Sequence, residues 1–100
     1  MVIRLQSDPY YENTVTLNGN LYRFTFRWTE TDLTSAWYLD IDGLTDPSSV
    51  LHGIALVGGV DLVEPYGVLD FGALWCVDMS GQNRDPSFEN ISTEFVLYYE

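Results

Sequence analysis

The sequence predicts an all-β protein, built as a single antiparallel β-sandwich or a small β-barrel of about seven short strands. Three observations predict it. Apolar and polar residues alternate with a period of two, turn-forming residues separate the alternating runs, and no segment keeps a 3.6-residue period over three turns. Short strands at this spacing are typical of packed antiparallel sheets or a closed barrel. One hundred residues are the usual length of one domain, which we expect to span residues 1–100.

The clearest local pattern is a hairpin turn at Asn18-Gly19, flanked by alternating runs on both sides. Both residues tolerate the positive φ that a two-residue type I′ turn requires. Such a turn places Val15 opposite Tyr22 and thereby sets the register of the whole hairpin. One face then carries Val15, Leu17, Tyr22, Phe24, Phe26 and Trp28, and the other carries Thr14, Thr16, Leu21, Arg23, Thr25 and Arg27. We expect the first of these faces to be core.

Further strands follow from the same alternation. They are expected at residues 2–5, 36–41, 54–57, 60–63, 73–79 and 93–99. Gly58-Gly59 separates the third and fourth of these and predicts a kink or a bulge there. The segment 73–79 is almost continuously apolar, which predicts a strand buried on both sides.

The charge of the chain limits its partners. Fifteen acidic residues face only four basic ones, all arginine, which gives a formal net charge of −11. This charge repels phosphate backbones, so we expect no direct nucleic-acid binding. No run of about 18 apolar residues is present, so we expect no membrane span. A lone cysteine, Cys76, cannot form an internal disulfide, which favours synthesis in a cytoplasm.

Catalytic and metal-binding sets are absent from the sequence. Cys76 lies in an apolar run, where an inert buried thiol is expected, and the only histidine, His52, lies in the loop-like segment 51–53. The segment 40–43 with Asp46 resembles a calcium loop, but its glycine comes too early and no glutamate stands at the twelfth position. One cysteine and one histidine do not make a zinc site. We therefore expect no enzyme activity, no catalytic residue, no metal and no cofactor.

Aromatic residues point instead to contacts with other proteins. Five tyrosines have no inward position in the predicted strands and are candidate interface residues: Tyr10, Tyr11, Tyr38, Tyr66 and Tyr98. Aromatic side chains are enriched in protein–protein interfaces. The core of a domain of this size is marginal, so neighbouring subunits can add stability, and a homo-oligomer is one such arrangement.

Three segments, in order and spacing, resemble a known family. They are residues 15–28, residues 36–41, and residues 77–81 leading through Asp85-Pro86 to residues 95–99. Together they are similar to small baseplate plug proteins of tailed phages, typified by that of a cyanophage with a contractile tail. The resemblance implies a virion protein at the distal end of the tail tube, made in the host cytoplasm. It also implies partners among the hub, spike and tail-tube proteins, and no active-site residues.

Two rival functions remain open on the sequence. An acidic phage protein can mimic DNA and inhibit a host nucleic-acid enzyme, which requires carboxylates in phosphate-like rows along one face. Here most of the carboxylates fall in loops, which argues mildly against mimicry. A small enzyme or sugar-binding domain would use exposed tryptophan and tyrosine as a stacking platform.

Overall fold

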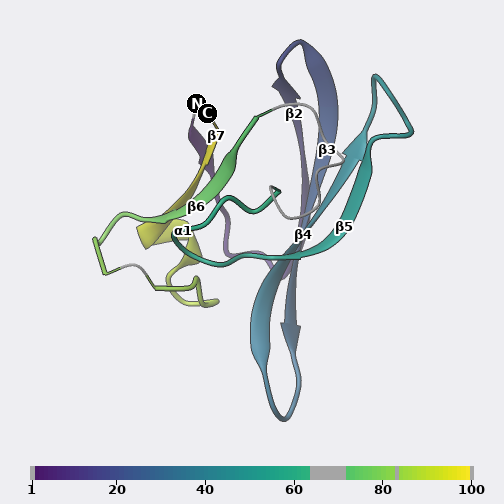
Figure 1. The fold of residues 1–100 in the computed structure, drawn as a ribbon. Helices are drawn as coiled ribbons and strands as arrows, with labels where there is room; N and C mark the ends of the chain where they lie inside the picture. The colour runs from purple at the N-terminus through teal and green to yellow at the C-terminus, as the bar shows by residue number, and fades with distance from the viewer. Residues whose placement is uncertain (1, 64–71, 83, 100) are drawn as a thin grey trace.

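The computed structural model of the chain describes residues 2–63, 72–82 and 84–99, which form two antiparallel sheets. The elements are β1 (Val2–Arg4), β2 (Tyr10–Leu17), β3 (Asn20–Glu30), β4 (Ser35–Gly43), β5 (Val50–Ala55), β6 (Leu74–Asp78), α1 (Ile91–Glu94) and β7 (Phe95–Tyr99). One sheet has the order β2-β3-β4-β5 and the other β1-β7-β6 (Figure 1). Neither sheet closes on itself, so the all-β prediction is confirmed in its sandwich form.

The β2–β3 hairpin has the predicted turn and register. Asn18 and Gly19 both have positive φ, 51° and 80°, as a type I′ turn requires. Val15 pairs with Tyr22, and every further pair follows from that one. β2 extends back to Tyr10, beyond the alternating run that the sequence shows. The chain is extended as far as Pro9, whose carbonyl accepts a hydrogen bond from the Trp28 amide at 2.8 Å.

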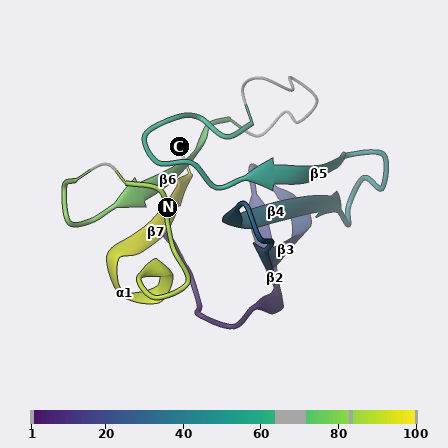
Figure 2. The same cartoon turned by 90° about the horizontal axis from the view of Figure 1, so that it is seen from below.

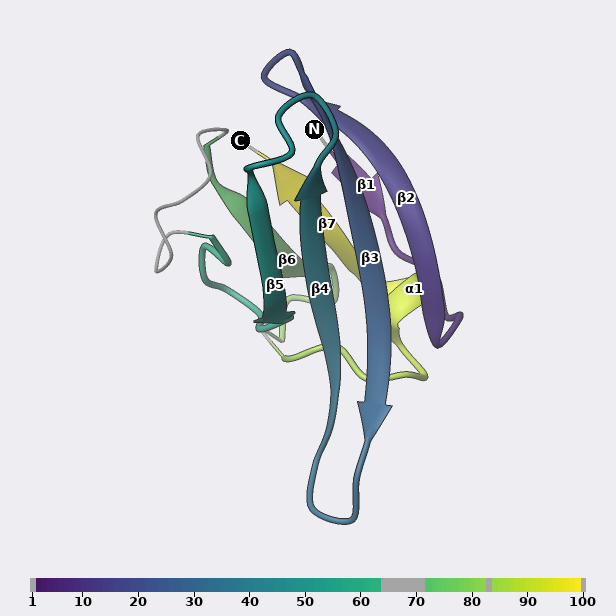
Figure 3. The same cartoon turned by 90° about the vertical axis from the view of Figure 1, so that its right-hand side faces the viewer.

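The β3–β4 hairpin is the longest feature of the molecule and projects beyond the rest of it (Figure 3). Its tip is ordered by one side chain: Thr31 Oγ1 accepts hydrogen bonds from the amides of Leu33 and Thr34. The strands pair in register from Tyr22 opposite Gly43 to Glu30 opposite Ser35.

The predicted strand 54–57 is wrong in extent, and the predicted strand 60–63 is absent. β5 begins at Val50 and ends at Ala55, so His52 lies in a strand and not in a loop. Residues 60–63 form no strand, and only isolated bridges at Gly58 and Asp61 reach β6, at the place where the chain crosses between the sheets (Figure 2). The physical reason is that the Asp61 carboxylate accepts from the amides of Val63 and Leu74, which makes a turn more favourable than a ladder.

Two predictions at the C-terminal end are also corrected. β6 is buried on one side only: Leu74 and Cys76 are fully buried, whereas Val77 is 39% exposed. The predicted strand 93–99 starts two residues later, at Phe95, because a single helical turn, α1, precedes it. One turn is too short to give a detectable helical period.

The core lies between the sheets. The predicted apolar hairpin face is confirmed, with Val15 and Trp28 packing at its margin. Its largest fully buried side chains come from both sheets and from α1: Leu17, Phe24, Phe26, Trp37, Leu39, Ile41, Ile54, Leu74, Ile91, Phe95 and Leu97. Burying one such side chain stabilises the fold by about 1.5–3 kcal/mol. Aromatic rings join the layers, with Trp37 stacked on Phe88 at 6.0 Å.

Candidate protein interface

The two side chains most suited to catalysis, the Cys76 thiol and the His52 imidazole, lie on opposite sides of the four-stranded sheet. Cys76 faces the core from β6, and burial raises the pKa of its thiol to about 12, so the reactive thiolate does not form near neutral pH. The His52 ring lies on the outward side of the four-stranded sheet, where its Nε2 is 2.8 Å from Asp42 Oδ1. That sheet separates the thiol from the imidazole, so the two cannot form a dyad.

The carboxylates that resemble a calcium loop do not converge. Asp40 bonds to Arg27, Asp42 to His52, and Asp46 accepts from the Ser48 amide and hydroxyl. Within residues 2–63, 72–82 and 84–99, no group of three histidine, cysteine, aspartate or glutamate side chains is placed to hold a metal ion. The one helix in this part of the chain, α1, has four residues and cannot cross a membrane.

The outward face of the four-stranded sheet is polar and its charges are paired. Arg27 forms a bidentate pair with Asp40, at 2.9 and 3.0 Å, and its guanidinium lies 5.7 Å from the Tyr38 ring. Burial alone would raise the pKa of Asp40, but hydrogen bonds from Arg27 and from the Gly53 amide outweigh it and keep that pKa below its usual range. Arg23 lies 3.7 Å from Glu12 in a looser pair.

The outward face of the three-stranded sheet differs in composition. The register places Val2, Tyr98 and Trp75 in one row across β1, β7 and β6, and Arg4, Val96 and Val77 in the next row. Met79 follows directly after β6. We call these seven residues the apolar face. Four of its apolar or aromatic members are well exposed, Val2 at 56%, Met79 at 56%, Tyr98 at 40% and Val77 at 39%, and Arg4 is exposed as well.

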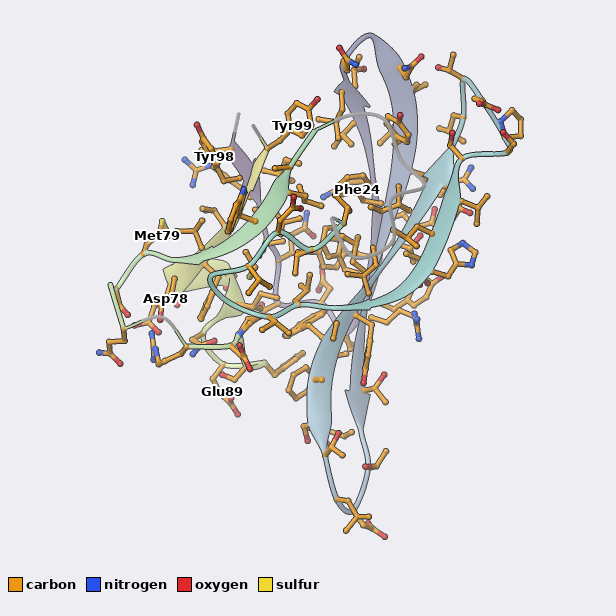
Figure 4. The ribbon with its side chains drawn as sticks, viewed as in Figure 1. Phe24, Asp78, Met79, Glu89, Tyr98 and Tyr99 are labelled. Carbon is orange, nitrogen blue, oxygen red and sulfur yellow. The ribbon has the colours of Figure 1, made fainter. Side chains whose placement is uncertain are left out.

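Side-chain directions agree with this assignment. Figure 4 shows Tyr98 and Met79 on the same outer side of the three-stranded sheet, whereas Tyr99 points toward the four-stranded sheet. Tyr99 packs against the core together with Phe88 and Val15. The alternation along β7 therefore separates one core tyrosine from one surface tyrosine.

The rim of the apolar face is fixed by an ion cluster. Arg84 donates to Asp78 at 2.9 Å and to Glu94 at 2.8 Å, and its guanidinium lies 5.8 Å from the Phe95 ring. Asp78, whose side chain is 1% exposed, also accepts from the Ser80 amide and hydroxyl. The pairing with Arg84 holds the pKa of Asp78 well below its usual range. The loop after β6 is thus tied to α1 and to the start of β7.

The five predicted interface tyrosines do not form one surface. Tyr10, 62% exposed, and the half-buried Tyr38 flank Arg27 on the four-stranded sheet, and Tyr98 lies on the apolar face. Tyr11 is buried, stacked on Phe26 at 4.8 Å, with its hydroxyl accepting from the Gln6 amide at 2.9 Å. Tyr66 lies outside the described residues.

The sequence reasoning missed most of the apolar face, including Val2, Arg4, Trp75 and Val77. A signal was present, because the run around Cys76 is apolar at consecutive positions and so has two apolar sides. That pattern indicates two covered sides. The structure shows that residues 2–63, 72–82 and 84–99 cover only one of them.

Comparison with known proteins identifies a family. The family model described as the cyanophage baseplate Pam3 plug gp18 matches residues 1–100. A search of curated proteins gave no match. Because the match covers the whole chain, the chain belongs to this baseplate plug family, and its general role is that of a structural baseplate component of a phage virion.

Proposed function

We propose that this member of the baseplate plug family closes or braces the distal end of the tail tube through contacts with the hub, spike and tube proteins. The observation that carries the proposal is the family match over residues 1–100. In the proposed role these residues act as one rigid β domain, made in the host cytoplasm and built into the virion without a cofactor.

The chemistry of the chain supports a structural role. The most reactive group, the Cys76 thiol, is buried with a raised pKa, and the exposed rings of Tyr10 and Tyr98 are suited to contacts with neighbouring proteins. The formal charge of −11 favours basic tube or hub surfaces and would repel DNA in the tube lumen.

Mimicry of DNA has less support. A mimic needs an unbroken row of carboxylates, but on the four-stranded sheet the carboxylates of Glu12 and Asp40 are paired with Arg23 and Arg27. These guanidiniums neutralise the row that a nucleic-acid enzyme would recognise.

Electron cryomicroscopy of intact and contracted tails tests the proposal. We expect density for the two-sheet fold across or beside the tube axis at the distal end of intact tails, and its displacement after contraction. A chain located far from the tube axis, or missing from purified virions, would refute the proposed role. A purified chain that binds one host nucleic-acid enzyme tightly would support mimicry instead.

A further inference from the structure

The apolar face gathers exposed apolar side chains in adjacent rows of one sheet. Its two rows hold five apolar or aromatic side chains and one arginine, with Met79 beside them. On the outward side of the other sheet the exposed apolar and aromatic side chains are dispersed among polar ones. Tyr10 stands opposite Arg27, Leu21 opposite Thr16 and Val50 opposite Asp42. Contiguous exposed apolar side chains on a small protein mark a binding site.

The residue types on the apolar face are those that dominate binding energy. Tryptophan, tyrosine and arginine are the most frequent hot-spot residues of protein interfaces. Trp75 and Tyr98 are directly paired across β6 and β7, and Arg4 stands in the adjacent row. The ion cluster of Asp78 and Arg84 fixes the rim, so little order has to be gained on binding.

Arg4 indicates the charge of the partner. Arg23, Arg27 and Arg84 each form an ion pair with a carboxylate of the chain. Arg4 is exposed and forms no ion pair within residues 2–63, 72–82 and 84–99, although the chain is rich in carboxylates. An arginine in an apolar contact needs a carboxylate from the other side, because an unpaired charge is costly to bury.

A second copy of the chain fits this face poorly. Two copies would each bring a formal charge of −11, which opposes self-association. A two-fold contact between apolar faces would also bring two Arg4 side chains and no carboxylate from the described residues of either face. Both points favour a different protein as the occupant.

We propose that the apolar face docks on an apolar surface of a different protein of the baseplate, and that this surface carries a carboxylate opposite Arg4. The proposal rests on the proposed function for the identity of the assembly. It adds which side of the molecule makes the contact and what chemistry the partner presents there.

Site-specific photocrosslinking in assembled virions tests which side makes the contact. A benzophenone amino acid replaces Val77 or Tyr98, and a matched set replaces Thr14 or Thr16, which are exposed on the outward side of the other sheet. We expect crosslinks from positions 77 and 98 to one other baseplate protein, in a peptide that contains apolar residues and an aspartate or glutamate. Crosslinks to a second copy of the chain, or crosslinks from positions 14 and 16 alone, would overturn the proposal.

Charge reversal tests the role of Arg4. Arg4→Glu should lower the amount of the chain in purified virions at least about tenfold, as loss of a hot-spot contact does. Arg4→Lys should reduce it much less, and reversing the partner's carboxylate to lysine should restore the Arg4→Glu variant. Normal incorporation of Arg4→Glu would overturn the proposal. A thermal melt of both purified variants, expected to match the wild type, separates assembly from folding.

These results also separate the two proposals. If the chain is located at the tube axis but its contacts come from the four-stranded sheet, the proposed function stands and the docking proposal fails. If purified virions contain none of the wild-type chain, the proposed function itself fails.

Discussion

The outward faces of the two sheets have the same alternating strand geometry but differ in the side chains that they expose to solvent. On the four-stranded sheet, Arg23 and Arg27 are paired with carboxylates of the same chain. On the three-stranded sheet, Val2, Val77 and Tyr98 stand exposed beside an arginine that has no ion-pair partner in the described part of the chain. The charges of the first face are paired within the chain, whereas we propose that the second face is completed by a partner. A baseplate protein that must dock in one orientation gains specificity from such an asymmetry.

The largest expected effect separates the inner and outer sides of one strand. Leu97→Ala removes a fully buried side chain from β7 and should destabilise the isolated chain by about 2–5 kcal/mol. Tyr98→Ala, at the next residue on the apolar face, should cost about 1 kcal/mol or less. Urea unfolding of the two variants measures both values. Equal losses would mean that the apolar face is part of the folding core and not a docking surface.

Acidification should act strongly on the rim of the apolar face. The pKa of Asp78 is lowered by its hydrogen bond from Arg84. A carboxyl with a lowered folded-state pKa stabilises the fold above its unfolded-state pKa and loses this stabilisation as pH falls through the folded-state value. We therefore expect the melting temperature of the wild type to decrease when the pH is lowered below about 4.

The matched variant for this effect is Asp78→Asn, which cannot titrate. It should be less stable than the wild type at neutral pH and should lose less on acidification. Thermal melts over a pH series provide the comparison. A variant with the full acid sensitivity of the wild type would show that the cluster of Asp78, Arg84 and Glu94 does not anchor the rim.

A smaller loss of stability is expected from a change on the outward face of the four-stranded sheet. Asp40→Asn removes the charge that Arg27 and the Gly53 amide recognise, and should cost about 1 kcal/mol. The loss should shrink at high salt, because Arg27 is 37% exposed and the pair is partly screened. Urea unfolding at two salt concentrations measures it. A loss that does not change with salt would contradict the electrostatic origin.

The smallest effect is expected at Arg4. In the isolated chain Arg4→Ala should change the free energy of unfolding by no more than about 0.5 kcal/mol, because the side chain is exposed and forms no ion pair with the described residues. Arg27→Ala, which breaks the bidentate pair, is the matched control and should cost more. A larger loss for Arg4→Ala would assign Arg4 a structural role within the chain.

Local rules were enough for much of the fold. The Asn18-Gly19 turn predicted the β2–β3 register, and the alternation of Phe24 and Phe26 predicted the core face. The strand expected at 60–63 failed because Asp61 replaces ladder hydrogen bonds with side-chain ones, which depends on its distance from Leu74 in the folded chain. Turn chemistry is local, whereas that hydrogen bond joins residues 13 apart.

The candidate interface was harder to predict than the fold. Alternation along residues 93–99 predicts the outward position of Tyr98, which the structure shows. It gives no position for Tyr11, because the pattern does not reveal that β2 extends back to Tyr10. Placing Trp75 beside Tyr98 requires the pairing of β6 with β7, and placing Arg4 in the next row requires the pairing of β1 with β7. The β1–β7 pairing joins the two ends of the described chain, and the β6–β7 pairing spans the loop and helix between residues 78 and 95, so no local pattern shows either of them.

Hydroxyl-radical footprinting of intact virions tests the central claim most directly, since it compares both faces in one sample. Met79, Tyr98 and Tyr10 are all exposed in the isolated chain and should all be oxidised there. In virions we predict strong protection of Met79 and Tyr98 and weaker protection of Tyr10. Met79 and Tyr98 as reactive in virions as in the free chain, or Tyr10 protected more than either, would contradict the claim that the apolar face is the covered one.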